Sequence, residues 1–229
     1  MSKQILIRVD ASSKIGTGHV MRCLALANEA KQRGWECTFV LRDPESDIVE
    51  CIASFDHRVK KVVSSVYVEK ITSNATAHGN WLPVSQIQDA METVDIIDDL
   101  KPDWIIVDHY ALDATWFSLV KNRIAKIMVI DDLGDRDLIC DLLLDQNLGA
   151  STEKYYGKLP TNCQLLLGPT FALLRSEFRE WRERSLKGRL NRNIENILIT
   201  MGGVDPENYM LKILTEITKS KYATKCAFT

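Results

Sequence analysis

Residues 4–34 read QILIRVDASSKIGTGHVMRCLALANEAKQRG and decide the fold. Four of the first six, 4–9, are apolar, as in a buried strand. Over 19–33 apolar residues recur at helical spacing, and a glycine ends the pattern. Two more glycines, Gly16 and Gly18, lie in the loop between the two patterns. A strand, a glycine loop and a helix form the opening unit of an α/β domain.

The same alternation continues along the chain. Further strands are predicted at 37–41, 59–63, 104–107, 126–130, 142–144 and 165–167, and further helices at 46–55, 85–101 and 113–123. Strands that alternate with helices predict a parallel sheet with helices on both faces. The irregular stretch 64–83 is long for a connection, and loops of that length are often functional.

After an Arg- and Glu-rich segment the strand and helix pattern starts again. We therefore expect a Rossmann-like N-terminal domain over 1–175, a linker helix over 176–193 and the start of a second Rossmann-like domain over 194–229. One strand–helix–strand unit cannot cover both faces of a parallel sheet. The second domain is therefore expected to be cut off after its first unit.

Composition excludes several classes of protein. With 29 Lys+Arg against 31 Asp+Glu the formal charge is −2, which excludes a polycation that binds nucleic acid. No apolar run approaches the roughly 18 residues of a membrane helix, and no secretory signal begins the chain, so a cytoplasmic protein is expected. The six cysteines form no C-x-x-C pair, which predicts free thiols. The oligomeric state cannot be inferred from these patterns.

Polar residues and glycines follow the predicted strands at their carboxyl ends, where parallel sheets bind ligands. They are Asp10, Gly16, Gly18, His19 and Arg22 after the first strand, Asp108, His109 and Tyr110 after the fourth, Asp131 and Asp132 after the fifth, and Gly202, Gly203, Asp205 and Asn208 after the first strand of the second domain.

The glycine loop before His19 suits an anion. Glycines let backbone N–H groups approach a ligand, and the following helix presents its partial positive end, which favours a phosphate. A dinucleotide site would need a third glycine and an acidic residue about 20 residues on. Met21 or Arg22 fills the third-glycine region and only Asp43 is a loose candidate for the acid, so that interpretation is disfavoured. Arg22 could pair with an anionic group or with a surface carboxylate.

Other residues keep two interpretations. His19 could simply bond a loop carbonyl, or act as a general base that activates water beside the phosphate loop. Asp108, Asp131 and Asp132 could cap helices or hold Mg²⁺, but no spacing selects a metal. His57 and His78 receive no role, and Trp81 is the tryptophan best placed to line a pocket.

Seven stretches in chain order resemble one family. They are residues 8–12, 15–27, 104–110, 130–133, 142–147, 168–175 and 201–206. In these stretches the chain is similar to the UDP-2,4-diacetamido-2,4,6-trideoxy-β-L-altropyranose hydrolases of the pseudaminic acid pathway, which are related to spore-coat polysaccharide proteins and to GT-B glycosyltransferases.

This resemblance implies a GT-B-like α/β fold with a sugar nucleotide between two Rossmann-like domains. Water would attack the anomeric carbon and UDP would leave, with inversion and without a metal or organic cofactor. The resemblance assigns the base to His19 and an active-site role to Tyr110, and places Asn147 and Arg175 among the substrate-binding residues. It implies a small-molecule partner, a UDP-sugar, and not nucleic acid or membrane.

Two alternatives stay open. A glycosyltransferase of the same fold would pass the sugar to an acceptor instead of water. A non-catalytic module that binds nucleotide sugars is the other, because 194–229 contains only part of the nucleotide site that the resemblance implies.

Overall fold

The computed structural model describes residues 3–62, 76–189, 196–201, 205, 207–220 and 227–228. The chain divides into two compact units, 1–173 and 174–229, each of which is described by itself.

The first unit is built on one parallel sheet of seven strands in the order β3-β2-β1-β4-β5-β6-β7. The strands are β1 (Gln4–Val9), β2 (Glu36–Arg42), β3 (Arg58–Val62), β4 (Trp104–Asp108), β5 (Lys126–Ile130), β6 (Leu142–Asp145) and β7 (Gln164–Leu167). The predicted strands are all present. The strand order changes direction between β1 and β4, and ligands bind at such a point in open α/β sheets.

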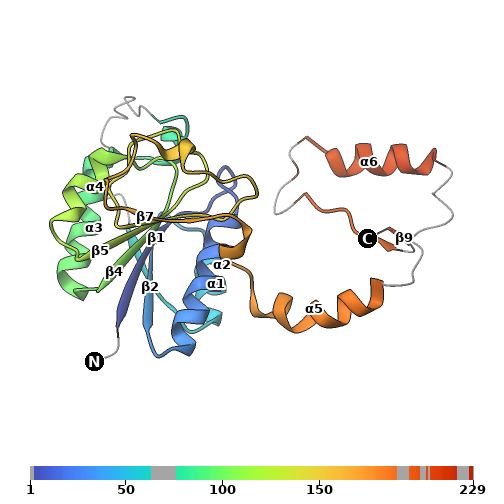
Figure 1. Cartoon of the computed structure of the whole chain (residues 1–229), viewed down its shortest axis with the longest axis horizontal. Helices are drawn as coiled ribbons and strands as arrows, with labels where there is room; N and C mark the ends of the chain where they lie inside the picture. The colour runs from blue at the N-terminus through green and yellow to red at the C-terminus, as the bar shows by residue number, and fades with distance from the viewer. Residues whose placement is uncertain are drawn as a thin grey trace. The chain divides into compact units, whose positions relative to one another are not determined.

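Helices cover both faces of this sheet (Figure 1). On one side lie α1 (Gly18–Gln32) and α2 (Ser46–Ser54), and on the other α3 (Gln86–Leu100) and α4 (Ala114–Lys121). Each face has its own apolar cluster, because side chains alternate between the two faces along every strand. In β1, Ile7 belongs to the α1 side and Leu6 to the α3 side, and both are fully buried.

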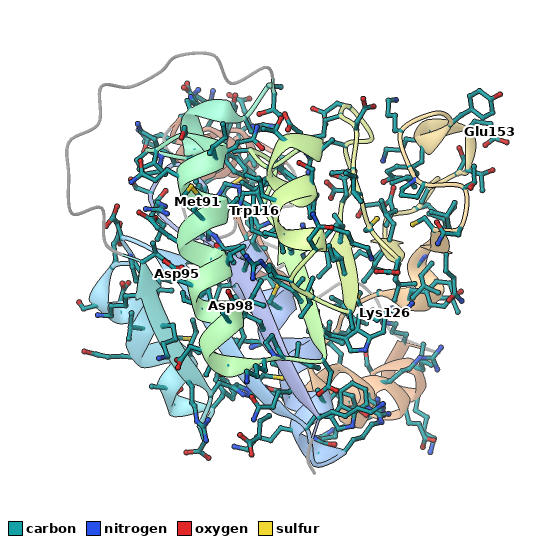
Figure 2. The ribbon with its side chains drawn as sticks, turned by 90° about the vertical axis from the view of Figure 1, so that its left-hand side faces the viewer. Met91, Asp95, Asp98, Trp116, Lys126 and Glu153 are labelled. Atoms are coloured by element: carbon teal, nitrogen blue, oxygen red, sulfur yellow. The ribbon has the colours of Figure 1, made fainter. Side chains whose placement is uncertain are left out.

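The helix α3 begins at a specific signal and has two different faces. The side chain of Ser85 accepts a hydrogen bond from the backbone N–H of Gln88, which caps the first turn. Figure 2 shows Met91, Asp95 and Asp98 on the outer side of α3. Its inner face instead packs beside the fully buried Trp116 of α4.

Three short 3₁₀ helices lie in the connections, η1 (Gly79–Trp81), η2 (Glu153–Tyr155) and η3 (Pro169–Phe171). The first falls inside the stretch that the sequence predicts as irregular, 64–83, of which 64–75 lie outside the described residues. A single 3₁₀ turn has too few residues to show a periodic pattern in sequence.

The second unit contains α5 (Ser176–Arg189), β8 (Asn196–Ile197), α6 (Tyr209–Thr218) and β9 (Ala227–Phe228). The strands β8 and β9 pair in parallel, with α6 between them in the chain. This strand–helix–strand unit is the one predicted for the start of the second Rossmann-like domain. The sequence predicts a strand over 194–200, and only two of its described residues pair.

None of the helices in the described ranges is long and apolar enough to cross a membrane.

Candidate active site

The candidate site lies at the carboxyl ends of β1 and β4, which are neighbours in the sheet. Val9 and Asp108 are register partners, so Asp10 and the residues after Asp108 leave the sheet side by side. The strand order changes direction between these two strands, and open α/β sheets bind ligands at such a point.

The glycine loop between β1 and α1 is a tight turn. The N–H of Gly16 donates to the carbonyl of Ser12 over 2.7 Å, and Gly16 has a φ of 78°, which favours glycine. A Cβ placed on Gly18 would meet no atom within 4 Å, so the protein's own packing does not require a glycine there. The N-cap of α1, Thr17, makes no side-chain capping bond. The first N–H groups of α1 therefore receive no cap from the Thr17 side chain. An anion site at a helix N-terminus requires N–H groups that are not capped in this way.

His19, in the first turn of α1, is held by Asp108. Its Nδ1 lies 2.6 Å from Asp108 Oδ1, and the His19 side chain is only 10% exposed. Burial raises the pKa of Asp108, but hydrogen bonds from Arg22 and His19 outweigh it and hold that pKa below its usual range. The ionised carboxylate therefore places the imidazole proton on Nδ1 and leaves Nε2 with a free lone pair.

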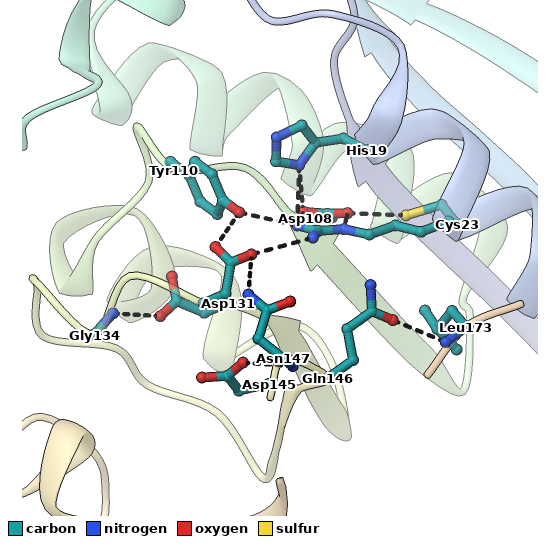
Figure 3. A network of polar contacts seen from close by, with 12 residues as sticks. His19, Cys23, Asp108, Tyr110, Asp131, Gly134, Asp145, Gln146, Asn147 and Leu173 are labelled. Carbon is teal, nitrogen blue, oxygen red and sulfur yellow. Dashed lines mark hydrogen bonds and ion pairs between the residues drawn. The ribbon is translucent and has the colours of Figure 1, made fainter. Parts of the chain in front are cut away.

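The other nitrogen of His19, Nε2, has no hydrogen-bond partner in the described part of the chain, and it is not among the fully buried unpaired atoms found there. It points away from the polar network below the ring (Figure 3). A buried carboxylate on one nitrogen and an open second nitrogen is the arrangement that general bases use.

Arg22, one turn after His19, contacts Asp108, Tyr110 and His19. It donates to both oxygens of Asp108 over 2.6 Å, and its Nη2 lies 3.3 Å from the hydroxyl of Tyr110. Nη2 is also 3.2 Å from His19 Nδ1, but its bond to Asp108 is shorter and settles where its protons point. The sequence left open whether Arg22 pairs with an anionic group or with a surface carboxylate. In the structure its partner is the buried carboxylate of Asp108.

Tyr110 is nearly buried and fixed by Asp132. Its hydroxyl donates to Asp132 Oδ1, and Asp132 Oδ2 accepts from Asn147 Nδ2 over 3.0 Å (Figure 3). Burial raises the pKa of Tyr110, and the bond to Asp132 adds to this effect despite Arg22 nearby. The phenol is therefore a neutral hydrogen-bonding group near neutral pH.

Two aromatic rings pack against His19. The ring of Tyr110 lies 4.7 Å from His19 and that of Trp81 5.6 Å, both edge to face. Trp81 in turn stacks on Tyr110 at 5.5 Å. These contacts fix the plane of the imidazole and exclude water from most of it.

Asp10 and His109 lie deeper, in a buried charge network. Asp10 accepts from Arg8, from the backbone N–H of Arg42 and from His109 Nε2 over 3.0 Å. The N–H of Ala111 donates to His109 Nδ1, so Nε2 carries the proton. Burial raises the pKa of Asp10, but Arg8 and His109 outweigh it and hold that pKa well below its usual range. With these oxygens occupied, Asp10 and His109 are placed to support the β1 and β4 loops.

The residues after β5 and β6 brace their own loops. Asp131 accepts from the N–H of Gly134 over 2.8 Å and lies 2.8 Å from Arg136. Asp145 accepts from Lys154 and from the Tyr155 hydroxyl. Among the described residues no group of three His, Cys, Asp or Glu side chains could hold a metal ion.

The remaining predicted site residues belong to the second unit. Asp205 accepts from the N–H groups of Tyr209 and Met210, both over 2.9 Å, and so caps α6. Asn208 precedes α6 in the left-handed region, with a φ of 53°, and Arg175 is exposed beside Phe178. Gly202 and Gly203 lie outside the described residues.

Two residues that the sequence did not suggest take part in these networks. Asp89 of α3 is fully buried and accepts from Arg8, Arg42 and Trp116. Its position on the same helical face as the apolar Ala90 and Ile97 was a detectable signal. His78 stacks on Trp81 at 4.6 Å, and no local sequence signal indicated this.

The fold defines the structural class, which is the α/β Rossmann-like GT-B fold. LpCGTa in complex with UDP aligns with a TM-score of 0.60 at 11% identity, over 100% of this chain and 65% of that one. MurG of Acinetobacter baumannii aligns at 0.56 and 10%, over 99% and 67%. UDP-GlcNAc 2-epimerase of Neisseria meningitidis aligns at 0.51 and 12%, over 98% and 64%.

Within this class the chain is similar to the UDP-2,4-diacetamido-2,4,6-trideoxy-beta-L-altropyranose hydrolase of Campylobacter jejuni. The two are 26% identical over 219 residues, which is 95% of this chain and 67% of the hydrolase. The resemblance inferred from the sequence motifs is confirmed. An uncharacterized protein of Methanocaldococcus jannaschii is 24% identical over 93% of this chain and 40% of its own length. The chain thus spans 67% and 40% of the lengths of these two relatives. No family model matches the chain.

Proposed function

We propose that the chain hydrolyses a UDP-linked 2,4-diacetamido-2,4,6-trideoxy sugar to the free sugar and UDP. The observation that carries the proposal is the buried pair of His19 and Asp108, which leaves Nε2 of His19 as an open base. The similarity to the Campylobacter jejuni hydrolase supports the choice of substrate.

In the proposed reaction Nε2 of His19 removes a proton from a water molecule. The water oxygen forms a bond to the anomeric carbon as the bond from that carbon to the phosphate oxygen breaks, which inverts the carbon. Asp108 stabilises the imidazolium that forms, because it stays ionised beside Nδ1. The second proton of the water becomes that of the anomeric hydroxyl.

Other groups would bind and orient the substrate. The glycine loop and the first N–H groups of α1 provide a site for the negative charge of UDP. Tyr110, neutral and held by Asp132 and Arg22, would accept a hydrogen bond from a hydroxyl or amide N–H of the sugar beside His19, since its own proton is donated to Asp132. UDP leaves readily, so holding the water and the sugar in line supplies much of the rate.

Release of UDP from the purified chain tests this proposal, with the full-length Campylobacter jejuni hydrolase as positive control. We expect turnover by the chain and, for His19→Asn and His19→Gln, a loss of at least about 100-fold in kcat. The matched control is His57→Gln, since His57 is bonded to Asn28 and lies outside the candidate site. Activity that survives both His19 substitutions would remove the base from the mechanism.

A second candidate function is glycosyl transfer, which the GT-B fold favours as directly as hydrolysis. Product analysis separates the two. Release of UDP and free sugar without an acceptor supports the hydrolase, whereas UDP release that requires an acceptor supports a transferase. UDP binding without turnover would instead support the non-catalytic module.

The free diacetamido sugar would then be a precursor of pseudaminic acid, and a cytoplasmic location would suit a nucleotide-sugar substrate. Proton NMR of the fresh product identifies the sugar and the configuration at its anomeric carbon. We expect the anomer inverted relative to the substrate, followed by slow mutarotation.

A further inference from the structure

The 3₁₀ turn η1 brings a second histidine to the site. His78 precedes this turn and Trp81 ends it, and the carbonyl of His78 accepts from the N–H of Trp81 over 2.9 Å. We call these two side chains the His78–Trp81 wall. It ends at Trp81, before α3 begins at Gln86, and reaches the ends of β1 and β4 through ring contacts.

The wall is held by the residues that surround His19. The ring of His78 lies 4.6 Å from Trp81 and 5.5 Å from Tyr110. Trp81 contacts His19 and Tyr110 and packs against the core. A substrate that reaches Nε2 of His19 therefore meets this wall.

His78 differs from the three other histidines, each of which has a ring nitrogen bonded to a side chain. His19 is bonded to Asp108, His57 to Asn28 and His109 to Asp10. For His78, which is half-buried, no hydrogen bond from either nitrogen is found in the part of the chain that the structure describes. A neutral imidazole offers one donor and one acceptor, so this ring can bind a polar group of a ligand.

The surroundings of His78 suit a sugar better than a diphosphate. Its neighbours are the faces of Trp81 and Tyr110, which are apolar. The guanidinium groups of Arg22 and Arg136, which lie 6.0 and 5.6 Å from the Tyr110 ring, are paired with carboxylates. Aromatic faces beside one polar group bind the methyl and amide of an acetamido substituent, or a deoxy methyl, by apolar contact and hydrogen bonding.

We propose that His78 is a specificity residue that hydrogen-bonds an acetamido group of the sugar, while Trp81 packs against its apolar atoms. This inference rests on the proposed function, because it presumes a nucleotide sugar at His19. His78 would bind the sugar in the ground state and the transition state alike, and would take no part in proton transfer.

Steady-state kinetics of His78→Phe and His78→Gln test the assignment. We expect His78→Phe, which keeps an aromatic ring, to raise KM about tenfold, as for one lost hydrogen bond to a buried polar group, with kcat within about threefold. His78→Gln retains a donor and an acceptor and should recover part of the loss. The inhibition constant of UDP should not change, since UDP lacks the acetamido groups.

Two kinetic results would overturn the assignment. One is an unchanged KM in His78→Phe, and the other is an equal rise in KM and in the inhibition constant of UDP, which would place the contact on the nucleotide. His57→Gln is the matched control and should leave both constants unchanged.

Histidine NMR gives a readout that does not depend on turnover. The sequence has four histidines, so the ring Cε1–H signals can be assigned with single substitutions. The probes are the free 2,4-diacetamido-2,4,6-trideoxy sugar and UDP, each added at millimolar concentration. We expect the sugar to shift the His78 signal, UDP not to shift it, and neither to shift His57.

The same spectra separate failure of this inference from failure of the proposed function. If the sugar shifts His19 but not His78, the sugar site stands and the role of His78 is overturned. If the sugar shifts neither signal, both the sugar site and the inference that rests on it are rejected.

Discussion

At the residue scale, the carboxylate of Asp108 decides what His19 can do. It is fully buried, receives both Arg22 and His19, and has a pKa held below its usual range. A neutral amide at this position could donate to Nδ1 and so move the imidazole proton to Nε2. The base would then have no free lone pair toward the water.

We therefore expect Asp108→Asn to lower kcat by about 100-fold or more with a smaller change in KM. The bulk of the side chain is conserved, and circular dichroism verifies that the variant is folded. Asp98→Asn is the matched control, because Asp98 lies on the outer side of α3 with an exposed pair to Arg123. A kcat for Asp108→Asn close to that of the unaltered chain would show that His19 does not need this carboxylate.

The sequence predicted which residues stand at the strand ends but not what each one contacts. His19, Asp108 and Tyr110 come together because their strands are neighbours, and strand order is only partly readable from a pattern. Asp10 and Asp131 stand at equivalent strand ends, yet their oxygens are occupied by arginines and backbone N–H groups. Only the packing of loops distinguishes these two kinds of aspartate.

At the element scale, helix and strand positions follow from local signals. The helix predicted over 85–101 is observed as Gln86–Leu100, with Ser85 as its N-cap and Lys101 in the left-handed region at its end. The turn η1 had no such signal. Its position depends on ring contacts with Tyr110 and His19, which are distant in sequence.

Removing the cap of α3 should destabilise the first unit. We expect Ser85→Ala to lower the free energy of unfolding by about 1 kcal/mol, because the N–H of Gln88 loses its acceptor. Urea denaturation measures the change. Ser118→Ala in α4 is the control, since its hydroxyl bonds only to the carbonyl of Thr115 within the helix and alanine is a better helix former. Equal losses in the two variants would argue against the cap.

At the scale of the whole molecule, buried charge joins the elements of the first unit. Asp10 follows β1, Asp89 lies in α3 and Asp108 ends β4, and each is buried with arginine partners. In all three, burial raises the pKa, but the arginines outweigh it and lower the pKa below its usual range. These pairs therefore couple the stability of the sheet and helices to pH.

The sign of this coupling follows from proton binding. The pKa of each of the three carboxyls is lower in the folded chain than in the unfolded chain, so below about pH 4 the unfolded chain binds more protons. The contribution of these groups is complete above that pH and is lost as pH falls through their folded pKa values. We expect the free energy of unfolding, measured in urea at several pH values, to fall steeply below about pH 4.

The two aspartate variants proposed above test whether Asp108 causes part of this pH dependence. Asp108→Asn should show a shallower fall, by up to about 1.4 kcal/mol per pH unit, because one such carboxyl is gone. Asp98→Asn should follow the unaltered chain. Parallel curves for Asp108→Asn and the unaltered chain would mean that Asp108 does not couple folding to protons.

The central claim is that water attacks the anomeric carbon of a UDP-linked sugar at His19. Hydrolysis in water enriched in oxygen-18, followed by mass spectrometry of both products before exchange, tests it most directly. We predict one labelled oxygen in the free sugar and none in UDP, because the bond between the anomeric carbon and oxygen breaks. Label in the β-phosphate of UDP, or no turnover at all, would contradict the account.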